Sequence, residues 1–457
     1  MTQRRALDVA GSAPLGKLHY TLLFWCSFIM LFDGYDLVIY GSVVPQLMEH
    51  WALTPVIAGW MGSAALFGMM FGAVVIGPLA DRLGRRKVIL SAMTLASVCT
   101  LGTAWAWDAE SFATLRFVTG VGLGGAIPNI VALMNDLTPK ARRSRMTTIM
   151  LSFYSIGAIF SALVAMFIIP RFGWEATFLV GGIPLLFLPW MYRQLPESLN
   201  FLLKKDKAAA SALLKRIDPA VNADQVRFDA PVRTSSAAPL SRLFTEGRGV
   251  GTVFLWLGFG MCMLMVYGLN TWLPKIMVAG GFPLGSSLMF LVTLNIGATF
   301  GALGGGWLAD RWGCKPTLIL FFLLAVISLC TLGIKPGPLL LNAMLLIAGA
   351  TTIGTLAVIH AFAAQQYPSE IRATGVSWCS AIGRFGAVAG PAMGGLMLSI
   401  NLPLQLNFIL CAVPGLVAIF AIATIKRRDV ASVGLNAQPA DTHHLNNVPN
   451  TDKGDIP

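Results

Sequence analysis

Four charged side chains lie inside otherwise apolar stretches of this chain. Asp33 and Asp36 occupy the middle of FWCSFIMLFDGYDLVIYGSVVP, Arg116 opens RFVTGVGLGGAIPN, and Arg384 lies in AIGRFGAVAG. Three residues separate the two aspartates, so a helix places them on one face. Burial and mutual repulsion both disfavour two charged carboxylates, so one of them is expected to bind and release a proton. The planar guanidinium of Arg384 suits a bidentate bond to the carboxylate of a bound molecule.

Each of these residues also has a purely structural interpretation. One aspartate could pair permanently with a buried arginine, or cap a kink at Gly34. Arg384 could in turn be a structural partner of Asp33 or Asp36. Ionised residues at the centre of a bilayer cost roughly 2.5–3.5 kcal/mol each on insertion scales, which favours a functional role for those that are kept.

The amino-acid composition indicates that these residues lie in a membrane-embedded protein. Of the 457 residues, 56% are hydrophobic and 12% are charged, and the mean hydropathy is +0.70. A soluble chain of this length needs more charge. The first apolar run carries no cleavage site and is interpreted as a retained span. The net charge of +12 is concentrated in short segments between apolar runs, which argues against nucleic-acid binding. The seven cysteines are scattered singly, so no metal site is predicted.

We predict an all-α membrane protein with twelve transmembrane helices. The apolar segments are 21–43, 57–79, 87–106, 111–135, 146–169, 174–194, 251–273, 285–308, 316–333, 338–363, 373–399 and 404–425. Lysine and arginine are concentrated in alternate loops, which predicts that both termini are cytoplasmic. The predicted parts are a cytoplasmic N-terminal segment (1–20), a six-helix bundle (21–194), a cytoplasmic linker (195–249), a second six-helix bundle (250–428) and a disordered cytoplasmic tail (429–457).

The two bundles are related by an internal repeat. GPLADRLGRRK begins at Gly77 and GWLADRWGCKP begins at Gly306, and the same separation relates Pro45 to Pro274. Two similar halves that rock against each other open a central cavity alternately to each side of the membrane. Asp33, Asp36, Arg116 and Arg384 have uncharged counterparts in the opposite half, which favours a role in the site over a role in the scaffold.

The repeated loop motif resembles the signature of the major facilitator superfamily. DGYDLVIYGSVVP is most similar to the benzoate carriers among the aromatic acid:proton symporters of that superfamily. The resemblance covers about residues 15–430 and implies that both aspartates are needed for transport and that Arg116 takes part in proton coupling.

The same resemblance implies a conformational latch at the cytoplasmic face. Asp81 is expected to cap the start of span 11, and Arg85 is expected to bridge to Asp136, which holds the outward-open state. The expected latch residues are Gly77, Asp81, Arg82, Gly84, Arg85 and Asp136, with Asp310 and Arg311 in the second copy. Cys314 replaces the Arg85 equivalent there, so that copy is expected to be weaker.

Further residues were considered for the substrate cavity. Tyr267, Asn270 and Trp272 lie near the end of span 7, where ring stacking and hydrogen bonds would suit an aromatic substrate. His360 in span 10 is interpreted either as a substrate or proton contact or as an ordinary helix-packing residue.

These observations predict a proton-coupled secondary transporter that imports an aromatic carboxylate, with benzoate as the first choice. The chain is expected to be a monomer without enzymatic activity or cofactor, in a bacterial-type cytoplasmic (inner) membrane, with the small aromatic carboxylate, protons and the lipid bilayer as its partners. The alternatives are a carrier of a hydroxybenzoate or another organic acid, an exporter, and a membrane sensor or chemoreceptor for aromatic acids.

Overall fold

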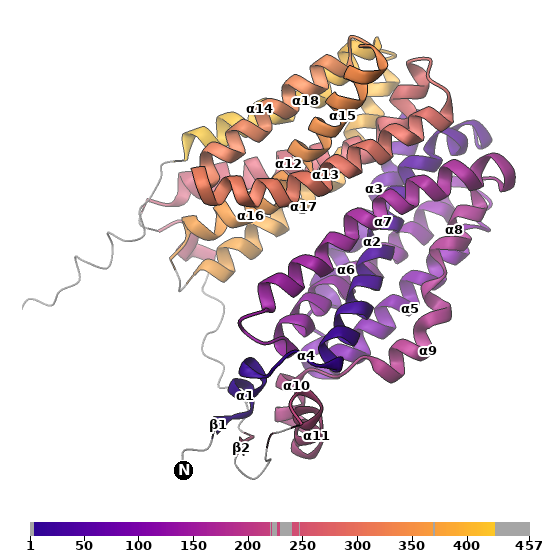
Figure 1. Ribbon diagram of the computed structural model, residues 1–457. Coiled ribbons are helices and arrows are strands. Elements are labelled where there is room, and N and C mark those ends of the chain that lie inside the picture. The colour runs from indigo at the N-terminus through magenta and orange to yellow at the C-terminus, as the bar shows by residue number, and fades with distance from the viewer. Residues whose placement is uncertain are drawn as a thin grey trace, which may run out of the picture.

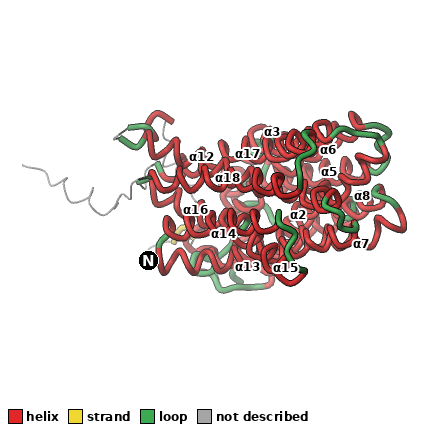
Figure 2. The backbone as a smooth tube through the Cα atoms, turned by 90° about the horizontal axis from the view of Figure 1, so that it is seen from above, coloured by secondary structure: helices red, strands yellow, loops and turns green. Residues whose placement is uncertain are grey.

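The computed structural model describes residues 4–219, 221, 226–228, 240–245, 247–368 and 371–425. Within these ranges the regular elements joined by the loops are all helices apart from two short strands, β1 (Arg4–Arg5) and β2 (Val226–Arg227), which pair in parallel (Figure 2). The predicted disordered tail, 429–457, and the last residues of the second predicted bundle, 426–428, lie outside the described residues.

The helices form two bundles joined by a linker (Figure 1). The N-terminal half contains α1 (Ala6–Ser12), α2 (Lys17–His50), α3 (Pro55–Val75), α4 (Ala80–Leu83), α5 (Arg85–Thr103), α6 (Ala109–Leu137), α7 (Arg143–Phe172), α8 (Glu175–Gly181) and α9 (Pro184–Gln194). The linker contains α10 (Leu199–Lys205), α11 (Lys207–Ile217) and the 3₁₀ helix η2 (Leu240–Leu243). The C-terminal half contains α12 (Gly249–Ala279), α13 (Leu284–Trp312), α14 (Cys314–Leu332), α15 (Pro338–Thr352), α16 (Thr355–Gln366), α17 (Arg372–Ser399) and α18 (Leu404–Thr424).

Eleven segments of the described chain are long and apolar enough to cross a membrane. Two of them are interrupted helices, α8 with α9 and α15 with α16. Pro184 at the start of α9 has no N–H to continue the helical ladder, which explains the first interruption. The twelfth predicted span is α5, whose average hydropathy is lowered by the basic residues at its start. It packs against α6 inside the N-terminal half, as a member of the bundle.

The two copies of the repeated loop motif build the same turn. Gly84 precedes α5 with φ of +97°, and Gly313 precedes α14 with φ of +92°. Glycine adopts this left-handed region without the steric cost that other residues meet. The internal repeat seen in the sequence is therefore also a repeat of backbone conformation.

We call the end of the molecule that carries α1, α4 and the linker the basic end, and the opposite end, where α2 turns into α3, the hairpin end. At the basic end α1 packs against α11, and the Lys140 amide donates a 2.9 Å hydrogen bond to the Gly11 carbonyl. The N-terminal segment and the linker helices α10 and α11 are thus attached to the N-terminal half, whereas Leu243 of η2 is buried in the core cluster of the C-terminal half.

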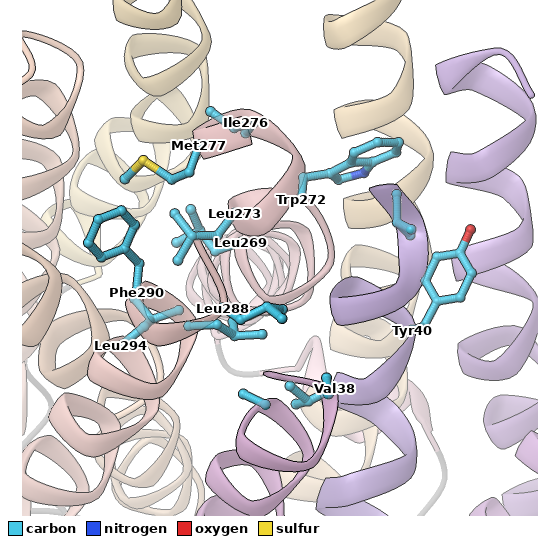
Figure 3. Packing of buried hydrophobic residues seen from close by; sticks show 14 of the residues in the cluster. Val38, Tyr40, Leu269, Trp272, Leu273, Ile276, Met277, Leu288, Phe290 and Leu294 are labelled. Carbon is cyan, nitrogen blue, oxygen red and sulfur yellow. The ribbon is translucent and has the colours of Figure 1, made fainter. Parts of the chain in front are cut away.

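Among the described residues, the core cluster that combines fully buried residues of both halves lies toward the hairpin end. One cluster there combines Val38 and Tyr40 of α2 with Leu269 and Trp272 of α12 and Leu288 of α13 (Figure 3). Toward the basic end the core divides into one large cluster within each half. The halves meet along the pairs α3 with α17, α7 with α13 and α2 with α12. The structure is therefore closed at its hairpin end.

Candidate functional site

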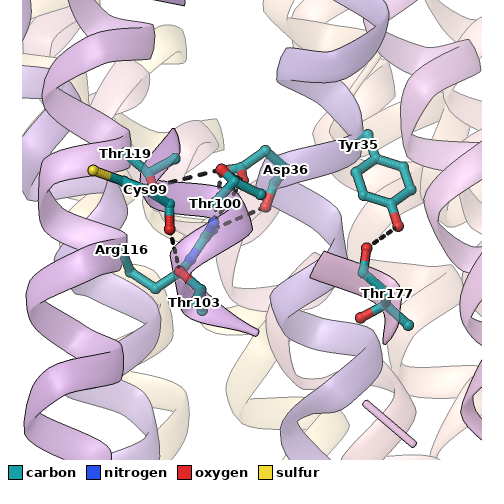
Figure 4. Close-up of polar contacts among 8 residues, drawn as sticks. All are labelled: Tyr35, Asp36, Cys99, Thr100, Thr103, Arg116, Thr119 and Thr177. Carbon is teal, nitrogen blue, oxygen red and sulfur yellow. Dashed lines mark hydrogen bonds and ion pairs between the residues drawn. The ribbon is translucent and has the colours of Figure 1, made fainter. Parts of the chain in front are cut away.

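A buried ion pair occupies the centre of the N-terminal half. Arg116 Nη1 of α6 lies 2.7 Å from each carboxylate oxygen of Asp36, and its Nη2 donates to the Asp36 carbonyl at 2.8 Å (Figure 4). The Thr100 hydroxyl of α5 donates to Asp36 Oδ1 at 2.9 Å. Asp36 is 4% exposed and Arg116 is 1% exposed.

This pairing matches the structural interpretation in which one aspartate is matched with a buried arginine. Charges removed from water need a partner and further hydrogen bonds to offset the lost hydration, and Asp36 has both. Tyr35, between the two aspartates, faces away from the ion pair and donates to the Thr177 carbonyl at 2.6 Å. Of the two aspartates of the DGYD motif, Asp36 therefore has an ion-pair partner, and Asp33 has none among the described residues.

Asp33 is buried against the junction of the two halves. It is 2% exposed, and its Oδ1 atom has no hydrogen-bond partner among the described residues. It interacts electrostatically with Asp36 on its own helix and with Arg384 on α17 of the other half. A buried carboxylate without a direct partner is costly, which makes Asp33 the group most sensitive to a proton or to a nearby cation.

Arg384 reaches from the C-terminal half to the N-terminal half. The half-buried side chain donates a 3.2 Å hydrogen bond from Nη1 to the Met69 carbonyl of α3. No ion pair of Arg384 is found within the described ranges. The guanidinium carries five N–H donors, so most of them remain available to an anion.

The structure brings Tyr267 and Asn270 of α12 to the same region. Both line a small pocket between the halves, together with Arg116. The Asn270 oxygen accepts a 3.1 Å hydrogen bond from Asn295 of α13. Trp272 instead donates to the Pro391 carbonyl at 2.8 Å and is buried in helix packing.

His360 of α16 lies in the C-terminal half against Phe259, with ring centroids 4.7 Å apart. Its Nδ1 is 2.7 Å from the Leu356 carbonyl, and its Nε2 is 3.3 Å from the Ser380 hydroxyl. A carbonyl oxygen only accepts, so Nδ1 donates to Leu356. The Ser380 hydroxyl lies between His360 Nε2 and the Val376 carbonyl, which is 3.1 Å away. Both ring nitrogens thus have partners within the half, as the packing interpretation expects.

The expected Arg85–Asp136 ion pair is present at the basic end, within the N-terminal half. Asp136 also accepts a 2.7 Å hydrogen bond from Ser198 in the linker. Glu197 accepts from the Arg86 amide at 3.1 Å, two residues after Gly84. These bonds attach the linker to the start of α5 in a structure that is closed at the hairpin end.

The other expected latch residues lie on the surface of the basic end. Gly77 precedes α4, on which Asp81 and Arg82 are exposed. In the second copy Arg311 lies over the Trp307 ring at 5.8 Å, and Asp310 interacts with Cys314. Capping of α17 by Asp81 stays a prediction.

Sequence reasoning missed three polar groups of this region. They are Tyr154 of α7, which lines the pocket with Tyr267, Thr100 beside Asp36, and Asn295 beside Asn270. Each is an isolated polar residue in an apolar run, and threonine and tyrosine are common in such runs. Asn295 carried the clearest signal, since a buried amide needs a partner.

Comparisons with known proteins agree with this architecture. The sequence profile of the Major Facilitator Superfamily matches residues 26–333 and 286–447. The benzoate transport protein of Acinetobacter baylyi is 37% identical over 92% of this chain and 92% of its own length. The gallate transporter of Pseudomonas putida is 36% identical over 91% and 93%. A 4-hydroxybenzoate transporter of Pseudomonas putida is 33% identical over 87% and 91%.

Solved structures share the fold at low sequence identity. The partially occluded inward-open xylose transporter XylE from E. coli superposes with a TM-score of 0.69 at 18% identity, covering 90% of this chain and all of that one. An inward-facing bacterial homologue of the human lysosomal transporter Spinster gives 0.70 at 15% identity over 92% and 99%. The chain is a membrane transporter of the major facilitator superfamily and a relative of its aromatic acid carriers, as the loop motif and DGYD predicted.

Proposed function

We propose that this protein imports an aromatic monocarboxylate, with benzoate as the first candidate, together with a proton across the bacterial cytoplasmic membrane. The observation that carries the proposal is that Arg384 and Asp33, from opposite halves, interact electrostatically although no ion pair joins them within the described ranges. Arg384 offers a cation with unused donors, and Asp33 offers a buried carboxyl without a direct partner. The names of the aromatic acid carriers at 33–37% identity support the class of substrate.

Charge balance supports one proton for each anion. Asp36 and Arg116 already neutralise each other. Asp33 and Arg384 carry opposite charges and interact electrostatically across the halves, without a direct ion pair among the described residues. An arriving carboxylate that binds Arg384 leaves Asp33 as an uncompensated buried negative charge, which is unfavourable away from water. A proton on Asp33 removes this penalty, so the loaded site stays neutral while the halves rock.

The distribution of basic residues supports the direction. Lysine and arginine follow alternate spans and gather at the basic end, which by the positive-inside rule is the cytoplasmic side. The hairpin end then faces the exterior and is the closed end in this structure. In this orientation the conformation is the one that releases cargo to the cytoplasm, and the described chain begins and ends on that side.

The test is uptake of labelled benzoate by purified protein in proteoliposomes, with and without an inward proton gradient. The proposal expects accumulation above the external concentration only with the gradient. Equilibration without accumulation would show a uniporter. Binding without any uptake would favour a sensor, the alternative from a different class.

The cargo is resolved by competition in the same assay. Excess unlabelled benzoate, 4-hydroxybenzoate, gallate and an aliphatic acid of similar size are compared as inhibitors. Benzoate is expected to compete most strongly. If a hydroxylated acid competes better, that acid replaces benzoate as the cargo, and strong competition by the aliphatic acid would overturn the aromatic class.

A further inference from the structure

A group of basic and aromatic side chains lies where α5 begins and α9 ends, at the basic end of the N-terminal half. The two helices pack side by side (Figure 1). Arg86 and Lys87 belong to the first turn of α5, and Arg193 belongs to the last turn of α9. The described part of the chain offers no ion-pair partner to any of these three, whereas Arg85 is paired with Asp136. This end of the two helices therefore carries an excess of positive charge.

The Arg86 side chain reaches from α5 to the last turn of α9. Its Nη2 donates to the Tyr192 carbonyl, and its Cζ lies 4.6 Å from the centre of the Tyr192 ring. Its Nε is buried and has no hydrogen-bond partner within the described ranges. Glu197 bonds the backbone amide of Arg86 and not its guanidinium. Because a guanidinium carries five N–H donors, the protein satisfies this one only in part.

Helix capping explains part of this arrangement. The internal repeat places Lys315 at the position of Arg86 in the second half. Its Nζ donates to the Ala423 and Ile425 carbonyls at the end of α18, at 2.8 and 2.6 Å. In both halves a basic residue thus binds carbonyls at the end of the last helix, where cations are favoured. That role uses one nitrogen of Arg86 and does not account for the other charges at the same place.

Two aromatic side chains at the end of α9 are exposed beside these charges. Trp190 is 54% exposed and Tyr192 is 63% exposed. They belong to the final turns of the candidate span Glu175–Gln194, and Lys87 and Arg193 are exposed as well. Tryptophan and tyrosine favour the level where lipid chains meet headgroups, because their rings are apolar and their tips are polar. This surface therefore combines rings that suit lipid chains with cations that suit a phosphate.

We propose that this surface binds an anionic phospholipid of the bilayer leaflet at the basic end, with its phosphate at Arg86 and Lys87 and its upper acyl chains against Trp190 and Tyr192. Arg193 adds a third positive charge. Basic side chains near a membrane surface attract anionic lipids, whereas the choline group of a zwitterionic lipid is repelled by the same cations. The phosphate oxygens accept from the guanidinium donors that the protein leaves unused. In the orientation proposed above, this is the cytoplasmic leaflet.

The test is a titration of phosphatidylglycerol or phosphatidylcholine into the purified full-length protein in detergent. A ligand of the folded state raises the unfolding temperature with its concentration, which gives an apparent Kd for each lipid. Phosphatidylglycerol is expected to bind at least about fivefold more tightly than phosphatidylcholine. Lys87→Gln and Arg193→Gln should each raise the Kd for phosphatidylglycerol about fivefold, the effect of one basic residue near an anionic surface. Both side chains are exposed and form no ion pair within the described ranges, so both variants are expected to fold.

Two further variants separate headgroup binding from helix capping. Arg86→Lys keeps the charge and can bind the carbonyl, as Lys315 does in the second half, but it loses the planar fork. It should raise the Kd for phosphatidylglycerol about fivefold, while the unfolding temperature without lipid stays unchanged. The matched control is Arg171→Gln, which removes one exposed positive charge at the hairpin end and should leave this Kd unchanged.

Equal stabilisation by the two lipids, or wild-type affinity in both Lys87→Gln and Arg193→Gln, would overturn the inference. Inorganic phosphate is the third arm of the titration. If phosphate displaces the lipid at an equal concentration, the site takes a free anion and the assignment to a lipid is wrong. Because the titration uses neither cargo nor a proton gradient, its result does not depend on the proposed function.

Discussion

Arg116 Nη1 lies 2.7 Å from both carboxylate oxygens of Asp36, in a site where neither side chain is more than 6% exposed. The pair connects α2 to α6 within one half, and Thr100 adds a bond from α5. It therefore ties three helices together, and it separates the two aspartates of the DGYD motif into one with an ion pair and one without. A substitution of Asp36 or Arg116 is therefore expected to change the stability of the protein as well as its transport activity.

Arg116→Met is expected to lower the free energy of unfolding by about 3–5 kcal/mol, because it leaves the Asp36 carboxylate buried without a partner. The double variant Asp36→Leu with Arg116→Met removes both charges and should recover most of this stability while remaining inactive in proton-driven uptake. Thermal unfolding in detergent measures the first effect. The exposed pair Lys140–Asp8 is the control, and Lys140→Gln should change stability by less than about 1 kcal/mol. Equal losses of stability in Arg116→Met and Lys140→Gln would contradict the conclusion that the Asp36–Arg116 pair is buried and the Lys140–Asp8 pair is exposed.

Arg384→Ala is expected to abolish benzoate uptake while membrane insertion stays normal, because the cargo loses its cation. Arg384→Lys keeps the charge but loses the planar fork, and should raise KM about tenfold. Initial rates in proteoliposomes, normalised to inserted protein, give both values. Arg171→Ala, at an exposed helix end, is the control and should transport normally. Wild-type kinetics in Arg384→Ala would remove this residue from the site.

Ser63→Ala is expected to weaken closure of the hairpin end. The Ser63 hydroxyl of α3 donates to the Val388 carbonyl of α17 at 2.6 Å, across the two halves. Loss of one hydrogen bond should speed amide exchange about fivefold in the hairpin-end part of α17, measured by hydrogen–deuterium exchange. Ser328→Ala removes a bond made within α14 alone and is the control. Unchanged exchange at α17 in Ser63→Ala would show that the apolar contacts alone hold this end closed.

Gly34→Ala is expected to reduce both stability and transport. The added methyl group meets the Tyr154 backbone, so α2 and α7 must separate, at a cost of roughly 1–3 kcal/mol. Gly304→Ala on α13 is the matched control, because nothing lies within 4 Å of a Cβ at that position. Alanine is a better helix former than glycine there, so this change should be neutral or slightly stabilising. Thermal unfolding of the Gly34→Ala and Gly304→Ala proteins distinguishes the two effects. Equal stability of the two variants would show that α2 and α7 tolerate separation.

The candidate site was predicted in part. Asp33, Asp36, Arg116 and Arg384 were identified because charges inside apolar runs are costly and therefore informative. The sequence did not show which aspartate pairs with which arginine. Arg116 is 80 positions from Asp36, and each arginine could have paired with either aspartate. Tyr154 was missed because a single tyrosine in a span carries no such penalty. For His360 the sequence left two interpretations open, and it carried no information on the two ring partners that the structure shows.

The sequence by itself determined the membrane class, the two related halves and which charged residues lie inside apolar runs, because hydropathy, repetition and intramembrane charge are all properties of the linear chain. The tertiary structure alone decided that Asp36 is matched with Arg116, that Asp33 and Arg384 interact electrostatically across the two halves, and that Tyr154 and Tyr267 line one pocket. It also decided which end is closed. These relationships depend on how helices far apart in sequence pack at glycine contacts, and local patterns carry no record of that packing.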